Sequence, residues 1–221
     1  MTVFEDARFH LTVSPDGLHA TVCRIRTDHV ADLFKDVRAH VPRARLIWIT
    51  DGSCEAELRA LGCRDQDPPL TSYITALATT EPPPTVAGIE IRRVHGYDEF
   101  LVAMQVANEG WQTDVAGDRK TRWSRHRDRP GGDWIAVLDG RPIAYAGAIA
   151  GPRGLFLTGG VTLPDARGRG AYRALVRARW EEATRRDTPA LVVHAEEASR
   201  RVLERIGFER VGNVVELVAD A

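Results

Sequence analysis

Hydrophobic and polar residues alternate over short runs in the second half of the chain, and this pattern predicts β-strands. The runs are GIEIRRV (88–94), DWIAVLDGRPIAYAGAIA (133–150), GLFLTGGVTL (154–163), PALVVHA (189–195) and VVELVA (214–219). The second run contains Asp139-Gly140, a turn signal typical of a β-hairpin, so we expect it to form two strands.

Between these runs, the spacing of apolar residues changes to that of helices. In 98–111 the apolar positions include Phe100, Leu101, Met104 and Ala107, which fall on one helical face. Helices are also predicted from Gly170 to about Arg186 and over 199–207, with Ser199 as an N-cap and Gly207 as the stop. Residues 112–130 are polar, and we expect a mobile loop or a short helix there.

The first third of the chain weakly repeats the last third. ARLIWITDGSCEAELRALGC (44–63) and PALVVHAEEASRRVLERIGF (189–208) both predict a strand, a polar turn with Ser, a helix and a Gly. YITALA (73–78) then repeats the pattern of VVELVA. Either the first part is half of the same fold, or the likeness of one strand-helix unit to another is accidental.

A proline run marks the expected domain boundary. Glu81-Pro82-Pro83-Pro84 stiffens the chain and cannot continue a helix or an inner strand. We therefore expect a smaller α/β half-domain over 1–80, a linker over 81–87 and a complete α/β domain over 88–221. The half-domain could cover one side of the acceptor cleft or an exposed sheet edge, or it could support a homodimer.

Composition narrows the functional classes. The chain has 221 residues and a net charge of −1, so no overall basic field favours nucleic acid or an acidic membrane. No apolar run approaches the roughly 18 residues of a membrane helix, and no secretory signal is visible. The three cysteines, Cys23, Cys54 and Cys63, form no CxxC pair, which favours a reducing cytoplasm and argues against a metal site.

The segment PDARGRGAYR (164–173) places two glycines and several arginines between a strand and a helix. A helix N-terminus has free N–H groups and partial positive charge, and glycine allows a ligand to approach the backbone closely. Together these features predict a phosphate or diphosphate site. A P-loop is excluded because no Lys or Ser/Thr follows Gly170, and Arg173 stands where a dinucleotide fingerprint needs its third glycine. In the first third, the stretch HVADLFKDVRAHVPR (29–43) ahead of Arg45 contains no glycine, so it cannot form such a loop.

The order of these elements resembles the Gcn5-related N-acetyltransferase (GNAT) superfamily over about residues 88–221. Three motifs carry the resemblance: Val161-Thr-Leu163-Pro164, Arg167-Gly-Arg-Gly170-Ala171 and Leu203-Glu-Arg-Ile-Gly207-Phe208. It implies a mixed, mostly antiparallel sheet flanked by helices, and acetyl-CoA or another acyl-CoA as co-substrate without a metal. It also implies that Val161 and Leu163 contact the pantetheine arm, whereas the diphosphate is held by Arg167, Gly168, Arg169, Gly170, Ala171 and Tyr172. For Arg173, Arg177 and Arg179 we prefer a solvated role.

The chain departs from the family at the step that protonates the departing thiolate. Leu203 stands where many members have a tyrosine that acts as the general acid. Tyr145 and Ser199 are other candidates, although a structural role suits both better. The Tyr172 ring is expected to pack into the core.

Candidates for the other catalytic roles lie near the predicted site. His194 can titrate near neutrality and serve as a base or be a buried structural histidine, and Glu196 can act through water. Glu109 can hold an amine or be a solvated helix-end charge. The basic segment 119–129, with Trp123 and His126, can clamp an anionic acceptor or a carrier protein, but we prefer to interpret it as a solvated charge run.

The sequence therefore predicts a cytoplasmic acyltransferase that moves an acetyl or other short acyl group from acyl-CoA to a primary amine of a small molecule. Direct attack in a ternary complex is expected because no cysteine follows Cys63. Two alternatives stay open: a CoA-binding protein without transferase activity, and a transferase whose donor is a carrier protein or an aminoacyl-tRNA.

Overall fold

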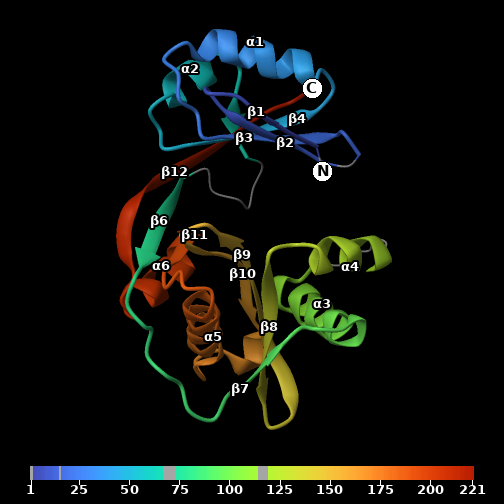
Figure 1. Cartoon of the computed structure of the whole chain (residues 1–221), viewed down its shortest axis with the longest axis vertical. Helices are drawn as coiled ribbons and strands as arrows, with labels where there is room; N and C mark the ends of the chain where they lie inside the picture. The colour runs from blue at the N-terminus through green and yellow to red at the C-terminus, as the bar shows by residue number, and fades with distance from the viewer. Residues whose placement is uncertain (1, 15, 67–72, 114–118) are drawn as a thin grey trace. The chain divides into compact units, whose positions relative to one another are not determined.

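The computed structural model describes residues 2–14, 16–66, 73–113 and 119–221, and these residues form two compact units. The first unit contains Met1–Ala76, His194–Arg200 and Arg210–Ala221, and the second contains Leu77–Val193 and Arg201–Glu209. Figure 1 shows the chain coloured from the N-terminus to the C-terminus.

The first unit is a sheet with helices on one face. Its elements are β1 (Thr2–Glu5), β2 (His10–Val13), β3 (His19–Cys23), α1 (Val30–His40), β4 (Arg45–Thr50), α2 (Glu55–Ala60), β5 (Arg64–Asp65) and β12 (Glu209–Ala219). The strand order is β1-β2-β3-β4-β12, with β5 also paired to β12. β1, β2 and β3 form an antiparallel meander, whereas β4 runs parallel to β3 and antiparallel to β12.

Buried and more exposed residues alternate along the strands, and this alternation explains why helices cover only one face of the sheet. Along β4 every second residue is buried, and Leu46 and Trp48 are completely inaccessible to solvent. α1 turns Val30, Leu33 and Val37, spaced three and four residues apart, toward the same core. The other face of the sheet carries half-exposed residues such as Thr12 and Ile47, and Figure 1 shows α1 and α2 together on the covered face.

The second unit has helices on both faces of its sheet. Its elements are β7 (Glu90–Arg93), α3 (Tyr97–Trp111), α4 (Arg119–Arg127), β8 (Gly131–Leu138), β9 (Arg141–Gly151), β10 (Gly154–Thr162), η1 (Pro164–Ala166), α5 (Ala171–Arg185) and β11 (Leu191–Ala195). The strand order is β11-β10-β9-β8-β7, antiparallel except where β11 joins β10. α3 and α4 lie on one face and α5 on the other (Figure 1).

The boundary between the units falls inside several elements, β11 and β12 among them. β6 (Tyr73–Thr79) leads the chain from the first unit into the second, and α6 (Glu197–Glu204) contains residues of both. α6 begins two residues before the expected start, so Ser199 is not its N-cap. The Ser199 hydroxyl instead donates to the Glu196 carbonyl, 3.0 Å away, inside the first turn.

The strands and most helices lie where the pattern predicts them. Asp139 and Gly140 both have positive φ, 51° and 77°, as the hairpin turn requires. The polar stretch 112–130 contains the helix α4, and residues 114–118 of that stretch lie outside the described part. No helix in the described ranges is both long and apolar enough to cross a membrane.

The division into units differs from the expected one at the C-terminus. The expected linker at 81–87 follows shortly after the first crossing, at Ala76–Leu77. The last segment, however, belongs to the first unit, because Val215–Ala219 of β12 pairs with Leu46–Thr50 of β4.

Candidate active site

The most irregular strand of the second unit is β10. It pairs with β9 along its length, but it pairs with β11 only over Leu155–Leu157. The register to β9 shifts between Thr158 and Gly160, and Gly159 has a φ of 45°. Beyond this bulge the edge of β10 that faces β11 has no strand partner among the described residues, and Gly159 and Gly160 are exposed. An unpaired main-chain edge of this kind can bind an extended ligand as an added strand.

The unpaired edge leads directly into the predicted anion loop. After η1, Gly168 and Gly170 have φ values of 79° and 91°, which glycine adopts without strain. The first hydrogen bond inside α5 runs from the Ala174 N–H to the Gly170 carbonyl. The N–H groups of the preceding turn have no acceptor inside the helix, and they give this end its positive character.

The surroundings of the loop leave room for a diphosphate. A Cβ built on Gly168 would meet no atom within 4 Å, and Arg167 and Arg169 are exposed. On another side the loop is closed, because a Cβ on Gly170 would lie 2.9 Å from Cγ1 of Val86. Exposed cations, free N–H groups and open space are what a diphosphate group needs.

Three other predicted cofactor residues have buried side chains. Val161 and Leu163 belong to the core, and the Leu163 N–H already donates to the Ile143 carbonyl at 2.9 Å. Ala171, the first residue of α5, is also buried. Only their main-chain groups are left for contact with a ligand, as in strand addition.

Tyr172 packs into the fold, as expected. A Cβ on Gly160 would lie 2.8 Å from Cε2 of the ring. Burial raises the pKa of the Tyr172 hydroxyl, so the side chain is neutral near pH 7. Its ring thus forms part of the wall beside the unpaired β10 edge.

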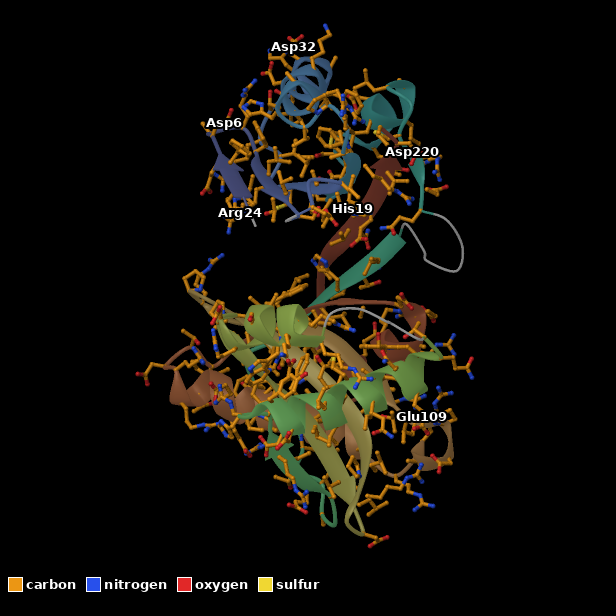
Figure 2. The ribbon with its side chains drawn as sticks, turned by 90° about the vertical axis from the view of Figure 1, so that its right-hand side faces the viewer. Asp6, His19, Arg24, Asp32, Glu109 and Asp220 are labelled. Atoms are coloured by element: carbon orange, nitrogen blue, oxygen red, sulfur yellow. The ribbon has the colours of Figure 1, made fainter. Side chains whose placement is uncertain are left out.

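The C-terminal end of α3 approaches the bulge from the face of the sheet opposite α5. Gly110 contacts Val161 so closely that a Cβ would clash with its side chain. The exposed Trp111 packs edge-on against Tyr145, with ring centroids 6.1 Å apart. Glu109 lies at the surface near this end of α3 (Figure 2).

A buried carboxylate on β8 binds a side chain of α4 and the hydroxyl of Tyr145, the residue that contacts Trp111. Asp133, 1% exposed, accepts hydrogen bonds from Arg129 at 2.7 Å and from the Tyr145 hydroxyl at 3.0 Å, and it pairs with Nδ1 of His126. Burial alone would raise the pKa of Asp133. The hydrogen bond from His126 and the charge of Arg129 outweigh burial and lower that pKa.

This network corrects the prediction that 119–129 is a solvated run. His126 and Arg129 are directed inward because the buried Asp133 is available to pair with them. Tyr145 is equally committed: burial and the adjacent carboxylate raise the pKa of its hydroxyl. A hydroxyl that already donates to Asp133 is a poor general acid.

Arg179 was expected in solvent and is instead 1% exposed. Its Nε donates to the Leu175 carbonyl at 3.0 Å, and its Nη1 donates to the Gly147 carbonyl at 3.1 Å. Burial lowers the pKa of this guanidinium. The prediction failed because a helix-face pattern does not show that a sheet carbonyl needs a donor.

The remaining predicted catalytic residues, His194 and Glu196, belong to the first unit. His194 is half-buried, and burial lowers the pKa of its imidazole, whereas Glu196 is exposed. Leu203 belongs to the second unit and is completely buried. The side chain that replaces the family tyrosine therefore serves the core.

A surface cavity of about 410 Å³ lies on the side of α5 that faces β7. Its lining includes Trp134, Arg93 and Arg177 but none of the loop residues Arg167–Tyr172. Arg93 already pairs with Glu182, and Arg177 pairs with Glu181. We therefore do not assign the co-substrate to this cavity. Within the described ranges, no group of three or more His, Cys, Asp or Glu side chains could hold a metal ion.

Comparison with known proteins identifies the class to which this fold and site belong. The model of the acetyltransferase (GNAT) family matches residues 97–208, just over half of the chain. The chain belongs to the GNAT acetyltransferase family, and membership supports a transferase. No match was found among curated proteins.

Solved structures show the same fold at low sequence identity. A GCN5-related N-acetyltransferase from Kribbella flavida is 16% identical with a TM-score of 0.69, and the match covers 100% of this chain and 90% of that one. One from Sphaerobacter thermophilus is 15% identical with a TM-score of 0.66, covering 96% and 80%. A tandem GNAT protein from the clavulanic acid biosynthesis pathway is 17% identical with a TM-score of 0.62, covering 96% and 78%. The expected fold class, a mixed sheet flanked by helices, is confirmed.

Proposed function

We propose that the chain transfers an acetyl or other short acyl group from acyl-CoA to a primary amine of a small molecule. One observation carries the proposal: the unpaired edge of β10 leads without a break into a glycine loop at the N-terminus of α5. An extended arm ending in a diphosphate matches this arrangement. Main-chain groups of β10 would bind the arm, and the loop N–H groups with Arg167 and Arg169 would bind the diphosphate.

The thioester supplies an activated acyl carbon when bound. The amine nitrogen attacks this carbon, the C–S bond breaks, an amide forms and a proton leaves the nitrogen. His194 and Glu196 stay the sequence-based candidates for accepting that proton, and we propose Glu109, at the end of α3, as a group that holds the amine. The lowered pKa keeps His194 neutral near pH 7, the state that a base requires.

A covalent acyl-enzyme is not part of the proposal. Cys54 and Cys63 are buried free thiols, and burial raises the pKa of both, that of Cys63 to about 11. A thiol of this kind is a weak nucleophile at neutral pH. Free thiols also agree with the cytoplasmic location that we propose.

Calorimetric titration with acetyl-CoA and CoA tests the binding half of the proposal. Gly168→Asp would place a carboxylate in the proposed diphosphate cradle, and Gly168→Asn is its uncharged match. Both side chains tolerate positive φ, and the space around Gly168 is open. We expect Asp to weaken binding by more than about tenfold relative to Asn, because like charges would meet.

Equal affinity of the two variants would contradict the assignment of the loop. If the folded wild type binds neither compound, acyl-CoA is not the donor, and carrier-borne and tRNA-borne acyl groups become the next donors to test.

A CoA-binding protein without turnover is the second candidate, and the buried Leu203 favours it. Binding of acetyl-CoA without release of CoA thiol across a broad panel of small amines would support this alternative. Release of thiol that depends on one amine would exclude it.

A further inference from the structure

Near the β10 bulge, the second unit contains buried hydrogen-bond donors that lack an acceptor among the described residues. Two of its buried side-chain nitrogens, Nε of Arg129 and Nη2 of Arg179, have no hydrogen-bond partner among the described residues. Buried donors of this kind are costly and usually satisfied. Both arginines adjoin Gly147, because Arg179 donates to its carbonyl and a Cβ built on Gly147 would lie 3.2 Å from Nη2 of Arg129.

The position of Gly147 explains why the donors gather there. Gly147 pairs with Thr158, the last regular position of β10 before the register shift. Arg179 thus donates to a sheet carbonyl at the point where the ladder is disturbed. No side chain larger than that of glycine fits, because a Cβ would clash with Asp133 and lie 2.9 Å from Oγ1 of Thr158.

The direction of α5 places Arg179 beside the reactive end of the proposed ligand. β10 and β11 are parallel, so the helix between them runs antiparallel to β10. An arm that enters at the loop and follows β10 backward from Thr162 reaches the bulge at Thr158. From Ala171 onward, α5 runs alongside β10 in the direction from Thr162 toward Thr158. Arg179 therefore lies beside the Gly147–Thr158 pair, where it donates to the Gly147 carbonyl.

The charges of the side chains around the bulge indicate that it favours a negatively charged group. Arg129 and Arg179 carry two positive charges, and Asp133 is the carboxylate whose charge acts on both. The Tyr145 and Tyr172 hydroxyls are neutral because their pKa values are raised. His126 pairs with Asp133 and adds no negative charge. The two guanidinium groups therefore outnumber the one carboxylate beside the bulge, and the charge of Arg179 is buried, where charge acts strongly.

We propose that Arg179 is a positioning residue of the transfer reaction, which holds the β10 bulge through Gly147 and, with Arg129, stabilises negative charge on the thioester. This inference rests on the proposed function. During attack the carbonyl electrons move to oxygen, and when the carbonyl re-forms, the C–S electrons leave on sulfur as a thiolate. A stabilised thiolate can depart without a proton donor in the site, which accounts for the leucine at 203.

The pKa of the CoA thiol in the complex tests the inference. It is followed by the ultraviolet absorbance of the thiolate against pH, with desulfo-CoA in a parallel titration to subtract the protein signal. A cation near the sulfur should lower the thiol pKa by about one unit or more relative to free CoA. Arg179→Met should remove most of this shift, whereas Arg179→Lys, which retains the charge, should preserve a large part of it.

Arg177→Met is the matched control on the same helix. Arg177 pairs with Glu181 and the Pro83 carbonyl, away from the bulge, so this variant should keep the full shift. Should Arg179→Met fail to fold, the comparison of wild type with free CoA and with Arg179→Lys still decides. A wild-type thiol that binds with the pKa of free CoA, or an Arg179→Met complex with the full shift, overturns the inference and leaves the proposed function intact. Absence of CoA binding removes both.

Discussion

The two units share an order of elements and differ in how regular those elements are. In the first unit an antiparallel meander, β1-β2-β3, is followed by α1, by β4 parallel to β3, and by α2. In the second, β8-β9-β10 is followed by α5, by β11 parallel to β10, and by α6. This likeness supports our proposal that the first part is a half-domain of the same fold.

The third strand of each meander shows the difference most clearly. β3 is paired on both edges, with His19–Val22 opposite Arg45–Trp48 and Ala20–Cys23 opposite β2. β10 has a bulge and loses its β11 partner after Leu157. A fully paired strand has no main-chain groups left for a ligand. Binding capacity in this architecture therefore depends on a local departure from regular pairing.

The turn that follows the third strand differs in the same sense. In the first unit, Arg24 through His29 contain no glycine, and Arg24 adopts a φ of 55° (labelled in Figure 2). Arg8, which lies beside this turn, is already bound to Asp6 and Asp36. In the second unit, Gly168 and Gly170 allow the corresponding turn to adopt positive φ without strain. The same helix position thus serves structure in one unit and suits a ligand in the other.

The largest expected difference in stability loss between the two units separates a buried carboxylate from an exposed one. Asp133→Asn removes the buried charge that Arg129, His126 and Tyr145 share, and we expect the free energy of unfolding to fall by about 3 kcal/mol. Asp36→Asn removes an exposed partner of Arg8 in the first unit, and we expect a loss below about 1 kcal/mol. Urea denaturation of both variants gives the two values. Equal losses would mean that Asp133 is not the anchor of α4.

A second test measures whether the first unit contributes to acetyl-CoA binding. Leu33→Ala in α1 and Leu175→Ala in α5 each empty a fully buried site and should cost about 2–5 kcal/mol. We expect Leu33→Ala to leave acetyl-CoA affinity within about twofold of wild type, because Leu33 belongs to the core of the first unit and the proposed loop to the second. Leu175→Ala, close to the loop, should weaken binding. A matching loss of affinity in Leu33→Ala would show that the first unit contributes to the site.

The smallest expected effect concerns His194 and pH. Burial lowers the pKa of this imidazole in the folded state, so the unfolded chain binds the proton at higher pH. Stability should therefore decline as pH falls below about 6.5, the ordinary value, until the lowered folded pKa is passed. His194→Gln should show a shallower decline in urea midpoints between neutral and mildly acidic pH. Identical slopes would mean that His194 does not set this dependence.

Most of the fold could be predicted from the sequence because its elements follow local patterns. The hairpin at Asp139-Gly140 and the glycine loop at 168–170 are each determined by a few neighbouring residues. The assignment of β12 to the first unit was not predictable in this way. It depends on pairing between Val215–Ala219 and β4, and two equally alternating strands do not encode which of them become neighbours.

The candidate site likewise has one part that the local sequence predicts and another part that it does not. The loop was found because glycine, arginine and a helix start occur together in sequence. The network of Asp133, His126 and Tyr145 was missed because its members come from α4, β8 and β9. The one available signal was a carboxylate at the start of the apolar run 133–138. Arg179 had no signal at all, since its acceptor is a backbone carbonyl of another strand.

The pairing of β12 with β4 also determines when the first unit can be completed during synthesis. β4 emerges from the ribosome early, whereas β12 emerges only after every strand of the second unit. Until then the edge of β4 has no partner, and an unpaired edge can associate with other chains. The nascent N-terminal unit therefore depends on the last strand to close its sheet, and removal of residues 210–221 should leave newly made protein prone to aggregation.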